Sequence, residues 1–449
     1  MSRARAVLPF EVTHRGVLAI AVPMTLAYLS TPLVGLTDTA VIGRLGDAAL
    51  LGGIAIGAIV FDVLFTTFNF LRAGTTGLTA QAFGADDVIE QRAILVRSVL
   101  VALAAGLVVI VLRQPLLDLG MMAMSASAEV EAAGRSYFEV RIYATPFVLL
   151  NYTILGWFLG LGRARTGLLL QLLLNGVNIV LDIYFVAELG WGVEGAAAAT
   201  LIAEALTAIA GGVLALAATT HGERPAWSTI FCADAFKTMF AVNRDIMIRS
   251  FSLLAAFAFF TREGARAGDI TLAANAILMN LFLIGGYFLD GFATAAEQLA
   301  GRAIGARWRP AFDRAVTITF VWSIGLGGML SAIFFAFGPM LIDGLTTNGE
   351  VRDVARVFLF WAALTPIVGA VAFQMDGVFI GSTWSDDMRN MMLASLAAYF
   401  AIWWFAVPVW GNHGLWLALL AFLGLRGVSL YWRLIKRRER AFASPGMVS

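Results

Sequence analysis

The chain has 449 residues, of which 60% are hydrophobic and only 14% charged, and its mean hydropathy is +0.82. Soluble proteins carry closer to a quarter charged residues, so this composition indicates a polytopic helical membrane protein. A net charge of +1 argues against a nucleic-acid partner. One cysteine and three dispersed histidines exclude an intramolecular disulfide and a Cys/His metal cluster.

The first fifteen residues are basic and polar, which is typical of a short cytoplasmic segment before the first span rather than of a cleavable signal peptide. Hydropathy, together with charged residues and Gly/Pro at the ends of the apolar segments, then predicts an all-α fold with twelve transmembrane helices. In the first half the predicted spans are 17–43, 50–80, 91–112, 137–161, 166–187 and 192–217. In the second half they are 240–261, 270–300, 311–335, 354–380, 389–410 and 414–435.

The longest polar connection follows the sixth span. It divides the chain into a six-helix bundle (1–218), a linker (219–238) and a second six-helix bundle with a basic tail (239–449). Lys and Arg gather at loops and chain ends that share one side of the membrane, as the positive-inside rule expects of cytoplasmic segments. We therefore expect both termini and the linker in the cytoplasm.

Short motifs of the first half recur in the same order about 220 residues later. The pairs are Gly46-Asp47 with Gly268-Asp269, Ala82–Ala85 with Ala303–Ala306, Thr145-Pro146 with Thr365-Pro366, Gly156–Gly160 with Gly377–Gly381, and Trp191–Gly195 with Trp410–Gly414. The nearly constant spacing predicts an internal duplication. Because each half has six spans, the repeats are expected to be parallel, as in transporters built from two bundles around a central cavity.

Asp38 lies near the end of the first, otherwise apolar span. A carboxylate in hydrocarbon costs at least a few kcal/mol and normally faces a partner or a water-filled cavity. Asp38 is therefore a candidate ion- or proton-binding residue. The alternative is a helix-end aspartate among lipid headgroups.

Three residues of later spans are predicted to lie at the depth of Asp38. Asn178 and Asp182 are four residues apart and share a helix face, and Thr200 lies about eight residues inside the sixth span. Two nearby carboxylates resist being ionised together, so such a pair can hold a proton near neutral pH. These four residues are predicted to bind the coupling proton, with a sodium ion as the alternative. The alternative is polar packing between helices.

A second set lies mainly in the second half. Asp290 and Glu297 are seven residues apart in the eighth span, and Gln374 and Asp376 lie in the tenth. Asp290, Gln374 and Asp376, together with Asn69 of the second span, are candidates for lining a substrate cavity or a second cation site.

Buried basic residues are expected to be few. Arg302 follows Glu297 by about one turn and can pair with it at the cytoplasmic surface. Arg72 either neutralises a carboxylate or extends toward the interface. A lipid flippase would need a positively charged cavity, yet buried arginine is expected only at Arg72, Arg141 and Arg426.

The stretches GLTDTAVIGRLGD, AGTTGLTAQAFGA, NGVNIVLDIYFV, WGVEGAAAATLIAE and LDGFATAAEQLAGRAIGA resemble the multidrug and toxic compound extrusion family, in particular its branch of DNA-damage-inducible protein F. The resemblance implies two six-helix bundles that form a V around a central cavity and alternate between inward- and outward-facing states. It implies export of organic cations and other amphipathic compounds in exchange for protons or sodium. The functional residues of the branch fall on Asp38, Asn178, Asp182 and Thr200.

Another bacterial branch of this family has an acidic coupling residue in helix seven. Here the seventh span, around 251–260, is apolar and rich in phenylalanine, which favours proton coupling through Asp38. We predict a monomeric antiporter of the bacterial inner membrane that is not an enzyme and has no cofactor beyond its coupling ion. The alternatives are a sodium-coupled exporter and a lipid or oligosaccharide-lipid flippase of the same superfamily.

Overall fold

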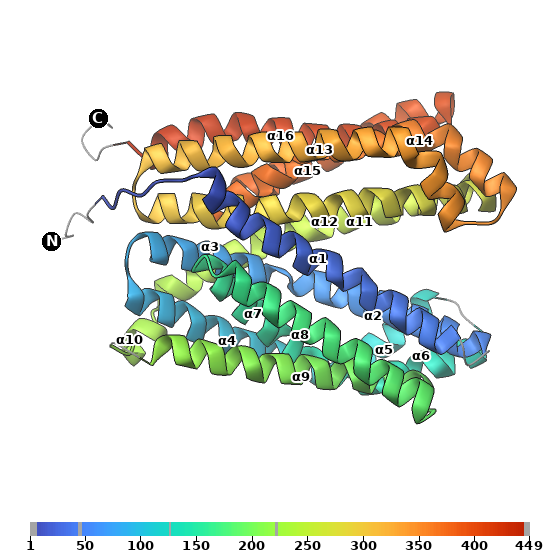
Figure 1. Ribbon diagram of the computed structural model, residues 1–449, viewed down its shortest axis with the longest axis horizontal. Coiled ribbons are helices and arrows are strands. Elements are labelled where there is room, and N and C mark those ends of the chain that lie inside the picture. The colour runs from blue at the N-terminus through green and yellow to red at the C-terminus, as the bar shows by residue number, and fades with distance from the viewer. Residues whose placement is uncertain (1–6, 44–46, 125–126, 221–222, 444–449) are drawn as a thin grey trace. The chain divides into compact units, whose positions relative to one another are not determined.

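The computed structural model describes all residues except 1–6, 44–46, 125–126, 221–222 and 444–449. The described part of the chain is helical and contains no β-strand (Figure 1). Eleven helical segments in it are long and apolar enough to cross a membrane. The predicted seventh span lies within α11 (Ala233–Arg266), a further long helix that carries more charge than these eleven, including Arg244, Asp245 and Arg249.

The helices form two compact units. The amino-terminal unit contains Leu26–Thr79 and Asp87–Phe240, and the carboxyl-terminal unit contains Met1–Thr25, Ala80–Asp86 and Ala241–Ser449. Three helices contribute residues to both units: α1 (His14–Gly43), α3 (Phe70–Gly84) and α11. The divisions between the units therefore fall inside helices as well as near the linker predicted at 219–238.

In the amino-terminal unit, two predicted spans are interrupted. The second is divided at Asn69, and the fourth contains a short 3-10 turn and begins earlier than predicted. The other elements of this unit are α2 (Ala48–Phe68), α4 (Val88–Val111), α5 (Arg113–Met124), α6 (Ala128–Arg141), η1 (Ile142–Ala144), α7 (Thr145–Gly160), α8 (Ala164–Asp182), η2 (Ile183–Glu188), α9 (Gly192–Thr219) and α10 (Trp227–Ile230). Helix α5 was not predicted, because twelve residues are too few to span a bilayer.

The carboxyl-terminal unit surrounds an aromatic core. The rings of Phe260 and Trp416 meet edge to face at 4.9 Å between centroids, and Tyr399 packs nearby against Phe422 at 6.0 Å. Such pairs stabilise a core beyond the burial of their area. The remaining helices of this unit are α12 (Asp269–Gly305), α13 (Arg309–Leu345), α14 (Gly349–Gly381), α15 (Ser385–Trp410) and α16 (Asn412–Ala441).

The predicted duplication recurs in the helix contacts. A Cβ on Gly84 would lie 1.9 Å from the carbonyl oxygen of Arg302, and one on Gly305 would lie 1.9 Å from that of Gln81. The two motifs predicted to be equivalent therefore cross each other reciprocally within the carboxyl-terminal unit. Only a residue without a side chain allows this approach of the two backbones.

A second pair of repeats confirms the equivalence. A Cβ on Gly156 of α7 would lie 2.4 Å from the carbonyl oxygen of Arg72. A Cβ on Gly377 of α14 would lie 2.1 Å from the carbonyl oxygen of Ala293. Arg72 and Ala293 are separated by the same interval as the two glycines. Each unit thus contains the same close crossing of a glycine-rich helix on its neighbour.

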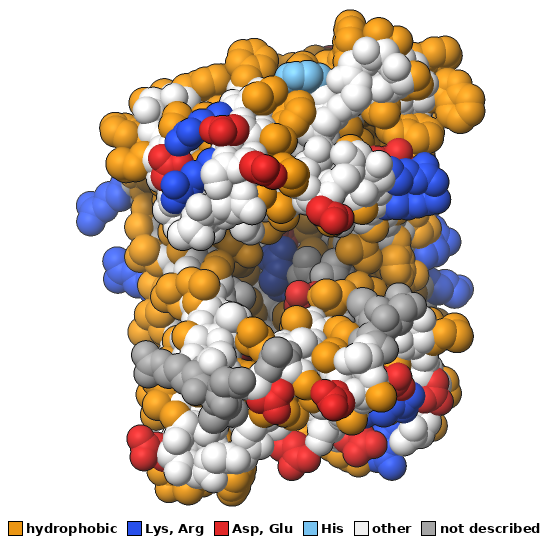
Figure 2. All heavy atoms as spheres, turned by 90° about the vertical axis from the view of Figure 1, so that its right-hand side faces the viewer, with side chains coloured by type: hydrophobic (Ala, Val, Ile, Leu, Met, Phe, Trp, Pro, Cys, Tyr) orange, Lys and Arg blue, Asp and Glu red, His pale blue; other side chains and the backbone are white. Residues whose placement is uncertain are grey.

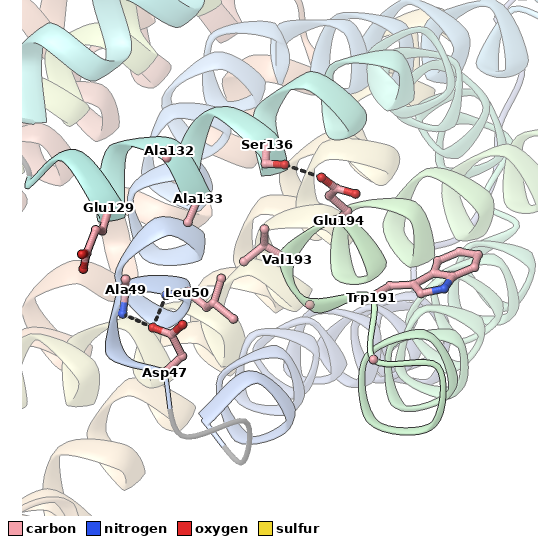
Figure 3. Close-up of a pocket in the computed structure, with 12 residues that line it drawn as sticks. Asp47, Ala49, Leu50, Glu129, Ala132, Ala133, Ser136, Trp191, Val193 and Glu194 are labelled. Carbon is pink, nitrogen blue, oxygen red and sulfur yellow. Dashed lines mark hydrogen bonds between the residues drawn. The ribbon is translucent and has the colours of Figure 1, made fainter.

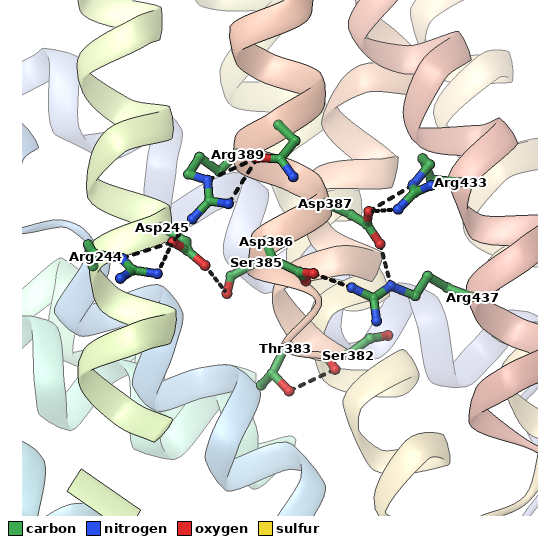
Figure 4. A network of polar contacts seen from close by, with 11 residues as sticks. Arg244, Asp245, Ser382, Thr383, Ser385, Asp386, Asp387, Arg389, Arg433 and Arg437 are labelled. Carbon is green, nitrogen blue, oxygen red and sulfur yellow. Dashed lines mark hydrogen bonds and ion pairs between the residues drawn. The ribbon is translucent and has the colours of Figure 1, made fainter. Parts of the chain in front are cut away.

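Ion pairs join helix ends in the carboxyl-terminal unit (Figure 4). Asp245 of α11 accepts a hydrogen bond from Nη1 of Arg389 at 2.6 Å. Asp387 of α15 is 1% exposed and accepts from both Arg433 and Arg437 of α16. Two cations on one buried carboxylate hold α15 and α16 together at this end.

Candidate functional site

Helices α1, α8 and α9 carry the predicted coupling residues Asp38, Asn178, Asp182 and Thr200, which we call the polar site. Nδ2 of Asn178 donates to the Thr200 hydroxyl at 2.9 Å, and that hydroxyl donates to the carbonyl of Ala196 at 3.2 Å. Asn178 and Asp182 are both buried and share a face of α8. Their spacing of four residues therefore places both side chains toward the interior of this unit.

Two carboxylates face each other in the polar site. The carboxylates of Asp38 and Asp182 are close enough to interact electrostatically, and Asp38 is partly exposed whereas Asp182 is 0% exposed. Three oxygen atoms of the polar site have no hydrogen-bond partner of ordinary geometry among the described residues. They are both carboxylate oxygens of Asp182 and Oδ1 of Asn178. A buried, ionised carboxylate without partners is costly, so this arrangement favours a shared proton or a bound cation. The same oxygens are the hard ligands that Na⁺ would use.

Arg141, expected from the sequence only as a buried arginine, interacts with this region as well. Its guanidinium lies over the rings of Phe61 and Tyr137, at 5.2 Å and 5.4 Å from their centroids, and Nη1 donates to the Tyr137 hydroxyl. Its charge interacts with the carboxylates of Asp38 and of Asp62 on α2. Arg141 therefore contributes a positive charge that acts on the candidate coupling residue.

A fourth acidic residue, Glu204, lies one turn beyond Thr200 on α9. Nδ2 of Asn151 on α7 donates to Oε2 of Glu204 at 2.7 Å and to its backbone carbonyl at 3.0 Å. Arg141 interacts with Glu204 as well. Asp62 and Glu204 each interrupt an apolar predicted span, so the rule that singles out Asp38 could have found them both.

Three polar residues of this unit lie where a helix changes its geometry. Asp182 ends α8 and is followed by the π-helical segment η2, and Arg141 ends α6 immediately before the 3-10 turn η1. Asn69 separates α2 from α3, and its Oδ1 accepts from Nε of Arg72 at 3.4 Å. Such irregular segments are frequent at functional sites because they redirect side chains and backbone groups.

The second predicted set, apart from Asn69, lies in the carboxyl-terminal unit. Asp376 of α14 is paired with Arg249 of α11 and lies 3.7 Å from Nη2 of Arg426 on α16. Asp290 of α12 interacts electrostatically with Arg426. Two arginines therefore compensate the charge of Asp376 through its Oδ2, while its buried Oδ1 has no hydrogen-bond partner among the described residues. Arg249 was missed because the seventh span was read as apolar.

Gln374 joins two helices of this unit. It is fully buried, and its Nε2 donates to the Thr319 hydroxyl at 3.0 Å and to the Val316 carbonyl at 3.3 Å, which joins α14 to α13. Glu297 is buried rather than at the surface, and the guanidinium of Arg302 lies over the ring of Phe10 at 4.1 Å.

A cavity of about 700 Å³ opens beside α2, α6 and α9 (Figure 3). Asp47 caps α2 there by accepting from two backbone N–H groups, and Glu194 accepts from the Ser136 hydroxyl. Glu129 and Trp191 complete an acidic and aromatic lining. Asp and Glu side chains are also spread over the end face of the molecule shown in Figure 2. None of the predicted site residues lines this cavity.

Comparison with known proteins shows one family over most of the chain. Residues 23–184 and 246–406 match the family model MatE. DNA damage-inducible protein F of Escherichia coli (strain K12) is 39% identical over 442 residues, which cover 95% of this chain and 93% of that protein. The probable multidrug resistance protein NorM of Bacillus subtilis (strain 168) is 23% identical over 441 residues, with 94% and 95% of the two chains covered.

Solved structures show the same fold. An outward-facing multidrug resistance MATE family transporter of the MOP superfamily matches with a TM-score of 0.86 at 19% identity, covering 95% of this chain and 96% of the other. A MOP superfamily transporter from Pyrococcus furiosus also gives a TM-score of 0.86 at 19% identity, covering 96% and 97%.

Proposed function

Because this chain belongs to the MatE family of multidrug efflux transporters, we propose that it exports organic cations and other amphipathic compounds in exchange for protons. The relatives are transporters rather than enzymes, and the helices are those of a multi-pass membrane protein.

The observation that carries this proposal is the fully buried Asp182 of the polar site, whose carboxylate interacts with that of Asp38. One of these carboxylates is buried without hydrogen-bond partners of ordinary geometry among the described residues. The pair can therefore change its charge by one when it takes up or releases a proton. The Asn178–Thr200 hydrogen bond holds the neighbouring polar groups of α8 and α9 in position.

Coupling follows from that change of charge. When the site opens to the outside, a proton from the external solution neutralises one carboxylate, which weakens the attraction for a cationic substrate and favours its release. When the site opens to the cytoplasm, the proton leaves and the restored negative charge attracts the next cation. Alternating access then moves one proton inward for each step in which substrate moves outward.

We place the protein in the bacterial inner membrane as a monomer, with both termini in the cytoplasm. The Escherichia coli relative and the distribution of Lys and Arg support this placement. A flippase for phosphate-bearing lipids is less well supported, because Asp290 and Asp376 offset the charges of Arg249 and Arg426 in the carboxyl-terminal unit.

The experiment that tests the proposal is substrate-induced proton release from proteoliposomes in sodium-free buffer. Wild type should exchange a cationic dye for protons. Asp38→Asn should lose at least 90% of this exchange, since the amide cannot bind the coupling proton, and Asp182→Asn should flatten its pH dependence. Asp118→Asn is the matched control, because Asp118 is 65% exposed at the end of a surface ion pair with Arg135. Full exchange by Asp38→Asn would contradict the mechanism.

A further inference from the structure

The segment 223–240, which joins α9 to α11 and includes α10, carries four aromatic rings in a row. We call this set the aromatic row: Trp227, Phe231, Phe236 and Phe240. Consecutive rings are stacked, with 5.8 Å, 6.4 Å and 6.1 Å between their centroids. Trp227 is 73% exposed, Phe231 57% and Phe240 53%. Large apolar side chains that are exposed side by side mark a surface that meets a protein or a membrane.

Another face of this segment is fixed to the amino-terminal unit. Helix α10 contacts α4, and Ile230 at its end is buried. The buried Arg92 of α4 donates from Nη1 to the backbone carbonyl of Glu223 at 2.6 Å. On α11, Met239 is buried, and its sulfur accepts from the Ser98 hydroxyl of α4 at 3.9 Å. These contacts hold the segment in one orientation, with the aromatic row on the outside.

The first turns of α11 separate aromatic from polar side chains. Phe236 and Phe240 are four residues apart and share a helix face. Asp234 and Lys237, both exposed, form an ion pair at 3.5 Å away from that face. Thr238 is also exposed and lies about 200° around the helix from Phe236, since successive residues are about 100° apart. A helix with an aromatic face and a charged face is typical of segments that lie at a membrane surface.

We propose that the aromatic row inserts into the headgroup region of the cytoplasmic leaflet and anchors the connection between the two halves to the lipid surface. Aromatic side chains are enriched at this depth of a bilayer. Helix α9, which is long and apolar enough to cross the membrane, ends at Thr219, shortly before Trp227. Its last turns carry exposed apolar side chains, including Val213 and Leu216. The aromatic row therefore follows directly on a surface suited to contact lipid.

The charges of the segment balance, so the attraction comes from the rings. Glu223 and Asp234 offset Arg224 and Lys237, and residues 223–240 contain no other charged side chain. A segment that selects anionic lipids would need a surplus of lysine and arginine. Insertion of the aromatic row should therefore occur in neutral and anionic bilayers alike and change little with salt.

The test is electron paramagnetic resonance of spin-labelled full-length protein in proteoliposomes. Because the chain has one cysteine, Cys232→Ser provides a cysteine-free background. Single labels are then attached through Phe236→Cys or Phe240→Cys in the aromatic row. Thr238→Cys is the matched control on the other side of the same helix. Collisions with oxygen, which concentrates in lipid, and with a water-soluble nickel complex identify the surroundings of each label.

Labels at positions 236 and 240 should give a ratio of oxygen to nickel collisions at least about threefold higher than the label at 238, because an interfacial helix exposes one face to lipid and the other to water. The same difference should be present in vesicles of phosphatidylcholine alone, in vesicles that contain phosphatidylglycerol, and at high salt.

Three results would overturn the inference. Equal ratios at 236, 240 and 238 would place the aromatic row in water. Protection of the labels at 236 and 240 from both reagents would indicate that protein covers the row instead of lipid. A difference seen only in anionic vesicles would indicate attraction by charge. Positions 236 and 240 report separately, so one folded variant of the two is sufficient, and none of these readouts depends on transport or on the coupling ion.

Discussion

Asp182 and Asp376 are both almost completely buried, at 0% and 4% exposure, yet they face different surroundings. Asp182 faces another carboxylate, whereas Asp376 is paired with Arg249 and approached by Arg426. Like charge beside a carboxylate makes its charge harder to accommodate, whereas a neighbouring cation compensates it. At the scale of single residues, the neighbours thus distinguish the proposed proton-exchanging carboxylate of one unit from the charge-compensated carboxylate of the other.

This difference predicts the effect of Asp376→Asn. The variant removes the carboxylate that pairs with Arg249 and leaves Arg426 with Asp290 alone, so the carboxyl-terminal unit gains positive charge. We expect export of cationic dyes to fall roughly tenfold relative to neutral substrates, which corresponds to about 1.4 kcal/mol, while proton movement per exported molecule stays unchanged.

The measurement is a comparison of dye and proton fluxes across a panel of cationic and neutral substrates. Asp353→Asn, which removes a highly exposed carboxylate from the same helix, is the control. Loss of all proton exchange in Asp376→Asn would show that Asp376 takes part in coupling.

At the scale of secondary-structure elements, the helices extend past their apolar segments and are joined there by polar contacts. Helix α13 runs from Arg309 to Leu345, although apolar sequence predicts only 311–335. Helices α15 and α16 continue to a network in which Asp387 is enclosed by Arg433 and Arg437 (Figure 4). Buried charges of this kind are stable only while both partners are present.

Removal of one partner should therefore destabilise this end of the unit. We expect Asp387→Ala to lower the free energy of unfolding by about 3 kcal/mol, because two partly buried arginines lose their carboxylate. The measurement is thermal unfolding in detergent. Asp386→Ala provides the control, since Asp386 is 52% exposed and its pair with Arg437 should contribute at most about 1 kcal/mol. Equal losses in the two variants would contradict the role of burial.

At the scale of the whole molecule, both described ends of the chain meet the start of α13. Nε of Arg314 donates to the carbonyl of Val12 at 2.6 Å, and the ring of Phe312 packs against Phe442 at 5.5 Å between centroids. Val12 and Phe442 therefore lie on the same side of the carboxyl-terminal unit. This agrees with an even number of membrane crossings.

A reporter experiment tests which side that is. Green fluorescent protein fused after the carboxyl terminus should fluoresce in cells, whereas alkaline phosphatase at the same position should be inactive, because the basic tail is predicted to remain in the cytoplasm. Fusions at Thr346, in the predicted outer loop between the ninth and tenth spans, should give the opposite pair of results. Active phosphatase at the carboxyl terminus would invert the proposed topology.

Much of the architecture is encoded locally and could be read from the chain. Apolar segments of membrane length predict the long helices, since a helix is the simplest way to satisfy backbone groups in lipid. The duplication was visible as repeated glycine motifs, and the structure shows why: Gly84, Gly305, Gly156 and Gly377 lie at close helix crossings that tolerate no side chain. Asp38, Asn178, Asp182 and Thr200 followed from intramembrane polarity and helix spacing, and the structure brings them together.

The tertiary structure alone decided which charges act on one another. Sequence spacing relates residues of one helix, but Arg141 meets Asp38, Asp62 and Glu204 across three other helices. The pairing of Arg249 with Asp376 likewise spans 127 residues of chain. Electrostatic energy depends on distance and burial in space, so composition and periodicity could identify these charged residues but not their partners.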